Sequence, residues 1–259
     1  MDPRASLPPR RGTPVVTPFP GGIGISGVTV YDEETADGLC GGTPHMHLVC
    51  SEAYVVIGGE GSVQTLTTTG FAETPLHQGD VVWFTPGTIH RLVNAGGLRL
   101  VVLMQNSGLP EAGDAVFTFP APVLADPQAY HAAAALTGDH AVAARCRRDL
   151  ALEGFLALRE GGLPEFHSAA HRLKRELLDD WETRWRRGPL AAARTTGRQL
   201  ERLRAGDLTH LGHGAVSRLE RPQRPSFGMC GLLHPYSLPA GPPGGPSGSP
   251  HVPPPKELS

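Results

Sequence analysis

The sequence predicts a mainly β domain, followed by an α-helical extension and a disordered Pro/Gly-rich tail. Three stretches of different composition support this order. Residues 13–122 alternate short apolar runs with clusters of Gly, Pro, Asp and Asn, whereas residues 126–206 are rich in Ala, Leu, Arg and Glu. From residue 235 onward, Pro, Gly and Ser dominate. Many short strands at regular spacing are typical of a β-barrel or a β-sandwich.

Five segments follow from these changes in composition. Residues 1–13 are Pro/Arg-rich and are expected to be disordered, as is the tail at residues 241–259. A β-barrel is expected over residues 14–124 and a helical region over residues 125–206. We expect residues 207–240 to pack on the barrel or on the helices.

The expected strands are seven apolar runs bounded by turn residues: GVTVY, AYVVI, SVQTLTT, DVVWF, HRLVN, RLVVLMQ and AVFTF. Because successive side chains of a strand point to opposite faces, alternation identifies the residues that face the interior. The inward-facing set is Tyr54, Val56, Gln64, Leu66, Leu92 and Met104. These side chains are largely apolar with a few hydrogen-bonding groups, so they predict a substrate pocket for a neutral small molecule.

An amphipathic helix is predicted where apolar side chains recur three or four residues apart, at Phe166, Ala170, Leu173, Leu177, Trp181 and Trp185. A Gly-Gly pair separates it from an earlier helix over residues 143–158. A Gly-Pro pair separates it from a later helix that ends at Arg204. We expect these helices to pack against the outer wall of the barrel or to cap its mouth.

The helical region also gathers arginines, seven of which lie between positions 184 and 204 with few acids nearby. A DNA-binding regulator would need a compact helix-turn-helix, but Gly-Pro breaks stand where its short turn would be. Arginines on the polar face of an amphipathic helix are usually solvated or pair locally. We therefore interpret this cluster as a solvated helix face.

Three histidines and one glutamate stand at spacings that suit a single metal ion. His45 and His47 lie two apart, so in a strand both imidazoles point to the same face. Glu52 opens the next apolar run, and His90 follows a Pro-Gly turn that would start a returning strand. Neutral imidazole is the commonest protein metal ligand, and a carboxylate oxygen favours an octahedral ion. The spacing therefore predicts a metal site.

This arrangement resembles the cupin superfamily over roughly residues 27–106. The first motif of that family, G-x5-H-x-H-x3,4-E-x6-G, is matched by His45, His47, Glu52 and Gly59. The second, G-x5-P-x-G-x2-H-x3-N, is matched by Gly79, Gly87, His90 and Asn94. Leu39 stands where the first motif opens with glycine, and Thr85 replaces the first proline of the second. Both departures are at turn positions rather than ligand positions.

The resemblance implies a jelly-roll β-barrel and one divalent transition metal held by His45, His47, Glu52 and His90. Iron(II) is the favoured ion, with manganese, nickel, cobalt or zinc as alternatives. Open coordination positions would let the metal act as a Lewis acid, as a generator of hydroxide or as a template. Glu52 would remain a ligand or detach to act as a catalytic base.

The scarcity of cationic side chains limits the substrate. The chain has only two lysines, Lys174 and Lys256, and between residues 27 and 106 the arginines are Arg91 and Arg99. Arg91 neighbours His90, so on a regular strand its side chain points away from the metal. Phosphates and dicarboxylates are usually bound by Arg or Lys, so a phosphosugar or a 2-oxo acid is disfavoured.

Our first interpretation is therefore an iron(II) dioxygenase, an oxidoreductase that acts on a neutral small organic molecule. A redox-neutral isomerase, epimerase or cyclase is the alternative among enzymes. A cupin regulator that binds a small ligand without catalysis is the alternative outside them. Resemblance of fold and site does not determine the reaction type, so all three stay open.

The whole-chain charge and the cysteines bear on partners and compartment. A formal net charge of −2 and a pI near 6.6 give no field that attracts nucleic acid or an anionic membrane. The N-terminus lacks the apolar segment of a secretory signal, and the four cysteines show no CxxC spacing, so we expect free thiols and a cytoplasmic protein. Cupins commonly pair through edge strands, which implies a homodimer.

Overall fold

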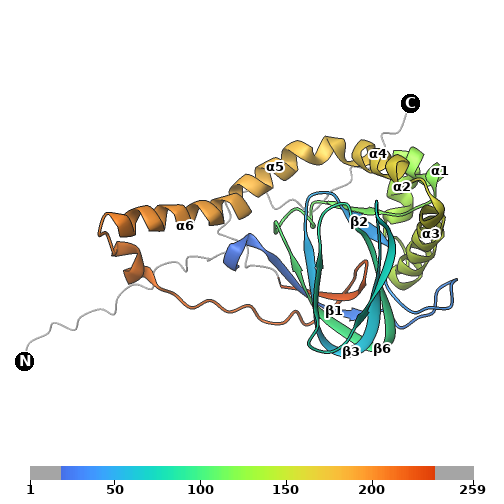
Figure 1. The fold of residues 1–259 in the computed structure, drawn as a ribbon, viewed down its shortest axis with the longest axis horizontal. Helices are drawn as coiled ribbons and strands as arrows, with labels where there is room; N and C mark the ends of the chain where they lie inside the picture. Colours follow the sequence, from blue (N-terminus) through green and yellow to red (C-terminus); the bar gives the residue numbers. More distant parts are fainter. Residues whose placement is uncertain (1–18, 237–259) are drawn as a thin grey trace, which may run out of the picture.

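The computed structural model describes residues 19–236. Within them, nine strands form one antiparallel sheet that curls into a barrel, and helices lie along one side of it (Figure 1). The strands are β1 Gly24–Val30, β2 His45–His47, β3 Glu52–Thr67, β4 Gly70–Leu76, β5 Val81–Phe84, β6 Ile89–Met104, β7 Ala115–Phe117, β8 Ser226–Phe227 and β9 Gly231–Pro235. The predicted disordered segments, residues 1–13 and 241–259, lie outside the described residues.

Two long strands, β3 and β6, form the centre of the sheet. They pair with each other along their length, although the sequence predicts each of them as two separate strands. Gly58-Gly59 and Gly96-Gly97, which lie between the predicted runs, are instead absorbed within the strands, and the pairing register shifts between Val56 and Gly61. A β-bulge leaves a residue unpaired and bends the strand, so β3 takes part in both halves of the barrel.

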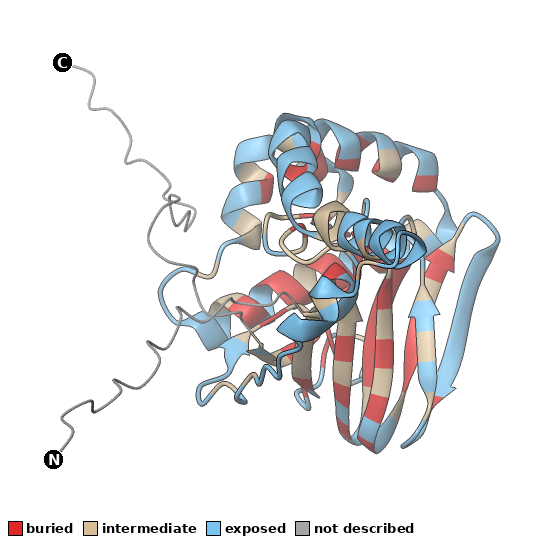
Figure 2. Ribbon diagram, turned by 90° about the vertical axis from the view of Figure 1, so that its left-hand side faces the viewer, coloured by how far each residue is buried: buried red, intermediate tan, exposed pale blue. Residues whose placement is uncertain are grey.

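The irregularity in β3 reverses which residues face the interior. Before it, Tyr54 and Val56 face the barrel interior, whereas after it the interior position belongs to Val63, opposite Leu92. Buried positions alternate with less buried ones on part of the sheet, as at the start of β3, whereas β4 is exposed as far as Pro75 (Figure 2). The interior core consists of Val28, Val30, Tyr54, Val56, Val63, Leu76, Leu92, Leu98, Leu100, Val102 and Cys230. Complete burial of one large apolar side chain contributes about 1.5–3 kcal/mol, so this core is a main source of stability.

The last described strands close one wall of the barrel. β9 pairs antiparallel with β1, and β8 pairs with β9. Neither strand was predicted from the sequence, because their residues follow a long polar stretch and contain Gly and Pro. Gly231 needs to be glycine here, since a Cβ atom would lie 2.1 Å from the carbonyl oxygen of Thr29.

Six α-helices separate β7 from β8 in the described chain: α1 Ala121–Ala125, α2 Pro127–Ala134, α3 His140–Glu160, α4 Leu163–Lys174, α5 Leu178–Arg187 and α6 Pro189–Arg204. Asp126 and Asp139 accept hydrogen bonds from the first backbone N–H groups of α2 and α3, which fixes where these two helices begin. None of the helices in residues 19–236 is both long enough and apolar enough to cross a bilayer.

The first four helices pack on the outer face of the barrel. Met46, Ile89 and Val116 point outward from the strands and form one core with apolar side chains of α1 to α4. The members contributed by the helices are Leu124, Tyr130, Ala151, Leu152, Phe155, Leu163, Phe166, Ala169 and Ala170. Helix α3 approaches so closely that a Cβ atom on Gly154 would lie 1.9 Å from the carbonyl oxygen of Thr118.

The predicted amphipathic helix is split into α4 and α5 by a 3₁₀ turn at Arg175–Leu177. Its apolar positions keep their common face, since Phe166 and Ala170 are buried against the barrel side and Trp181 packs with Cys50 and Leu109. Trp185, the last of the series, is 37% exposed. From there α6 leads away from the barrel (Figure 1).

Candidate metal centre

Three strands bring the predicted ligands together. His45 and His47 lie on β2, and His45 stands directly opposite His90 of β6. Glu52 is the first residue of β3. All four side chains are at least 96% buried, and their ligand atoms lie within 4.8 Å of one another.

Backbone carbonyls set the tautomers of two histidines. Nδ1 of His45 lies 2.8 Å from the carbonyl oxygen of Thr43, and Nδ1 of His90 lies 3.1 Å from that of Thr88. A carbonyl only accepts, so each Nδ1 carries the proton and each Nε2 presents a lone pair. The two Nε2 atoms are 3.1 Å apart.

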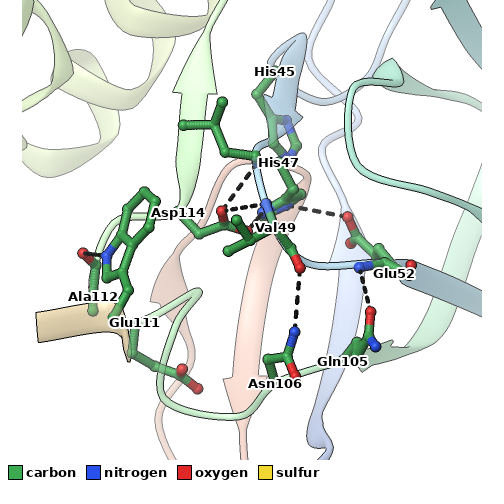
Figure 3. A network of polar contacts seen from close by, with 12 residues as sticks. His45, His47, Val49, Glu52, Gln105, Asn106, Glu111, Ala112 and Asp114 are labelled. Atoms are coloured by element: carbon green, nitrogen blue, oxygen red, sulfur yellow. Dashed lines mark hydrogen bonds and ion pairs between the residues drawn. The ribbon is translucent and has the colours of Figure 1, made fainter. Parts of the chain in front are cut away.

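A carboxylate orients the third histidine. Nδ1 of His47 donates to Oδ2 of Asp114 at 3.1 Å, and Oδ1 of Asp114 accepts from the backbone N–H groups of Leu48 and Val49 (Figure 3). Asp114 is completely buried. A carboxylate that accepts from the far nitrogen of a ligating imidazole fixes its orientation and raises its basicity. Asp114 was not predicted as part of the site, because a single aspartate far along the chain carries no spacing signal.

The remaining ligand atom lacks a hydrogen bond. Oε2 of Glu52 is buried without a hydrogen-bond partner, 3.3 Å from Nε2 of His47 and 3.1 Å from Nε2 of His90. Lone pairs and a carboxylate oxygen that converge in this way repel one another unless a cation lies among them. The four residues therefore fit a divalent metal ion, and their buried group is one that could hold it.

Burial and neighbouring charges shift the pKa values of three of these residues in different directions. Burial, followed by the nearby His90 and His47, holds the pKa of His45 well below its ordinary value, so this imidazole stays neutral. Burial would also lower the pKa of His47, but its contacts with Asp114 and Glu52 outweigh it and raise the pKa to about 9, so a metal ion would displace a proton from this imidazole at neutral pH. Burial opposes the charge of Glu52, yet the neighbouring His90 and His47 lower the pKa of this carboxyl below its ordinary value.

Comparison with known proteins agrees with this geometry. A family model described as the cupin domain matches residues 33–105. These residues form a cupin domain. No curated protein gives a significant match to the chain.

Solved structures similar to the chain include cupins of different kinds. An RmlC-like cupin protein from Desulfovibrio desulfuricans is 20% identical over 32% of this chain and 71% of its own, with a TM-score of 0.26. The CENP-C cupin domain of Drosophila melanogaster is 20% identical over 32% of this chain and 57% of its own, with a TM-score of 0.25. QdtA, a sugar 3,4-ketoisomerase from Thermoanaerobacterium thermosaccharolyticum, is 14% identical over 36% of this chain and 64% of its own, with a TM-score of 0.31.

A cavity of about 200 Å³ opens onto the ligand group of the cupin domain. His45, His47 and Glu52 lie in its wall, so a metal held there would face the cavity. Most of the other lining residues are apolar or small: Gly24, Ile25, Ser26, Val28, Val102, Met104, Pro110, Met229, Cys230, Leu233 and Pro235. Glu111 also lines the cavity, and no lysine or arginine does.

Of the six predicted pocket residues, one lies in the cavity wall and three lie in the interior core. Met104 lines the cavity, whereas Tyr54, Val56 and Leu92 lie in the interior core of the cupin domain rather than in the cavity wall. Met229, Cys230 and Leu233, which the sequence analysis missed, supply the opposite wall from the chain around β9. Sequence alternation had no means of placing a strand so far along the chain.

Gln64 and Leu66 were assigned to the wrong face. Gln64 pairs across the sheet with Arg91 and hydrogen-bonds to it, and Leu66 packs in the outer core under the helices. The bulged stretch of β3 reverses the alternation between Val56 and these two residues, which accounts for the error. As expected, Arg91 points away from the metal group, where its buried guanidinium pairs with Asp37.

Cys50 lies between His47 and Glu52 in sequence but does not join them. It is 1% exposed and packs with Leu109 and Trp181. Burial, followed by the charge of Asp114, raises the pKa of this thiol well above its ordinary value, so it stays protonated and is a poor metal ligand.

Proposed function

We propose that the cupin domain is a mononuclear metalloenzyme, an iron(II) dioxygenase that acts on a small neutral organic molecule. The observation that carries this proposal is the convergence of three imidazole lone pairs and one carboxylate on the wall of an open cavity. A protein that only binds a ligand has no need of a metal with open coordination positions. Three nitrogen ligands and one hard oxygen suit iron(II) among the transition metals.

Each residue of the site would have a distinct role in this proposal. His45, His47 and His90 would hold the metal, and Asp114 would keep His47 in the ligating tautomer. When bound, the metal would supply a Lewis-acid centre with positions for substrate or dioxygen. Glu52 would complete the ligand set or, on leaving it, accept a proton from the substrate.

The cavity supports the proposed class of substrate. Its volume of about 200 Å³ is below the roughly 300–1,000 Å³ of pockets that hold drug-sized ligands. No lysine or arginine lines it, so it lacks the side chains that usually bind a phosphate or a dicarboxylate. A small, neutral and largely apolar molecule satisfies both limits.

The test is metal analysis after anaerobic purification, followed by measurement of dioxygen consumption. We expect one equivalent of iron in the wild type and little metal after His45→Ala. His77→Ala is the matched control, because His77 is exposed on the loop before β5 and contacts only Asp80 among charged groups. Full metal content in His45→Ala would overturn the site itself.

Other outcomes separate the alternatives. Zinc alone, with no dioxygen uptake, would favour a redox-neutral isomerase, epimerase or cyclase. Binding of a small ligand by a protein that takes up no metal would favour a regulator without catalysis. Either result contradicts the dioxygenase proposal while leaving the fold unaffected.

A further inference from the structure

One part of the chain stands apart from the barrel and is unlike it in charge. We define the basic arm as residues 184–224, which comprise the end of α5, all of α6 and the extended segment that returns toward β8. The arm leads away from the barrel (Figure 1), and no residue of α6 is buried. It contacts the body at both ends: Pro189 lies against Gly22 at the start of α6, and the carbonyl oxygen of Pro222 lies 3.3 Å from Nδ1 of His234 on β9.

Charge is separated between the arm and the rest of the described chain. The arm contains ten arginines, with Glu201, Asp207 and Glu220 as its acids. The other described residues contain nine basic and twenty acidic side chains. The whole-chain charge of −2, from which we expected no attraction to anionic surfaces, therefore averages a strongly basic arm with an acidic body.

Most of this positive charge is free of carboxylate partners among the described residues. Arg184 pairs with Asp180 and Arg186 with Glu182, each across one helical turn. Arg202 lies 3.9 Å from Asp207. No described carboxylate pairs with the remaining arginines of the arm: Arg187, Arg194, Arg198, Arg204, Arg218, Arg221 and Arg224. All ten arginines of the arm are exposed.

Helix α6 is amphipathic, and beyond its first turn, which packs near Gly22, its apolar side chains are exposed. Arg194, Arg198 and Arg202 follow one another four residues apart and form a stripe along one face. Leu200 and Leu203 lie on another face, where they are 49% and 45% exposed. Beyond the helix, the tip of the arm adds further exposed apolar side chains, Leu208, Leu211 and Val216.

We propose that the basic arm binds the surface of an anionic membrane. A helix with arginines on its polar face and leucines on its other face lies in the plane of a bilayer interface. The arginines would form ion pairs with the phosphate and carboxylate groups of anionic lipids, and the leucines would be buried in the acyl region. The acidic body would be held away from the same surface by its own charge, which suits an arm that extends from it.

Two other partners explain only part of the surface. A nucleic acid would accept the arginines through its phosphates but would leave the leucines at the tip in water. A second copy of the chain, packed on the apolar face of α6, would cover the leucines. It would leave both arginine stripes, which lie on another face of the helix, in water without an anionic partner.

Vesicle co-sedimentation tests the proposal on the full chain. We expect the protein to sediment with phosphatidylcholine vesicles that contain phosphatidylserine, not with phosphatidylcholine alone, and to be released by high salt. Neutralising the stripe in Arg194→Gln/Arg198→Gln/Arg202→Gln should weaken binding about 100-fold, because each basic side chain contributes about 1 kcal/mol near an anionic leaflet. The matched control neutralises three exposed arginines of the body: Arg99, Arg172 and Arg175.

A second variant separates insertion from simple charge attraction. Leu200→Gln/Leu203→Gln keeps the helix propensity and the charge, and we expect binding to fall at least tenfold because the buried leucine surface is lost. Equal binding to neutral and anionic vesicles would overturn the proposal. So would retention of a DNA duplex by the arm without any binding to vesicles, or self-association that the leucine variant abolishes.

Discussion

Asp114→Asn tests whether the buried carboxylate sets the protonation of His47. Oδ1 of Asp114 accepts from two backbone N–H groups at 3.0 and 2.9 Å, so in the variant the amide oxygen must stay on that side. The amide NH₂ would then face Nδ1 of His47, where Oδ2 of Asp114 accepts a hydrogen bond in the native protein. Two donors cannot face each other, so His47 would place its proton on Nε2.

An imidazole protonated on Nε2 has no lone pair for the metal at that atom. A hydrogen bond to a charged group contributes about 1.5–3 kcal/mol, and loss of such an outer partner typically lowers metal affinity about 10–100-fold. We therefore expect the metal dissociation constant of Asp114→Asn to rise by about 10–100-fold. Competition with a chromophoric chelator measures the constant, and far-UV circular dichroism checks that the variant is folded.

Two further variants make the result decisive. Asp114→Ala leaves Leu48 and Val49 without their acceptor but does not force a tautomer on His47, so it should bind metal more tightly than Asp114→Asn. Asp37→Asn removes a different carboxylate, on the opposite face of the sheet, and should leave metal affinity unchanged. A metal affinity for Asp114→Asn within about twofold of the wild type would refute this reasoning, since the smallest loss expected is about tenfold.

Three other predictions concern stability and assembly. Gly154→Ala should destabilise the protein to urea although alanine favours helices, because its Cβ would meet the carbonyl of Thr118. Gly197→Ala, in open space on α6, should stabilise it by up to about 1 kcal/mol, and equal effects would contradict the close packing of α3. Asp37→Asn should cost about 3 kcal/mol at pH 7, because it leaves the buried Arg91 guanidinium without its charge partner. Burial opposes the charge of Asp37, but hydrogen bonds led by Arg91 lower its pKa to about 2, so the wild type's advantage should persist above pH 4 and vanish as the pH falls through 2. A constant difference across that range would contradict the ion pair. Trp83→Glu, at a side chain 72% exposed on edge strand β5, should convert the expected homodimer to a monomer in light scattering, and an unchanged mass would exclude that edge.

Residue spacing was enough to predict the ligand group, because each ligand lies on a strand whose alternation is regular nearby. His45 and His47 share a face by parity, and the returning strand that carries His90 begins at a recognisable turn. The amphipathic series and the Gly-containing breaks at its two ends were predicted for the same reason, since periodicity is a local property. The 3₁₀ turn at Arg175–Leu177 that divides the series, and the short helices α1 and α2, were not predicted.

Other features depend on contacts that no local pattern reports. The register shift within β3 reversed the faces of Gln64 and Leu66, and the local sequence does not indicate where this shift occurs. Asp114 meets His47 through the fold alone. The charge of the arm was visible in the sequence, but its separation from the body appears once the chain is folded.

The pairing of β9 with β1 also bears on how the protein is made. Strands from opposite ends of the described chain must meet before the barrel closes, with all six helices synthesised between them. Contacts between residues distant in sequence form slowly, because a long loop must close first. On the ribosome, His45, His47, Glu52 and His90 would emerge well before Met229, Cys230 and Leu233 complete the cavity wall. The nascent chain would thus pass through a stage in which the ligand group is open to solvent, which offers a route for metal to enter before the wall is sealed.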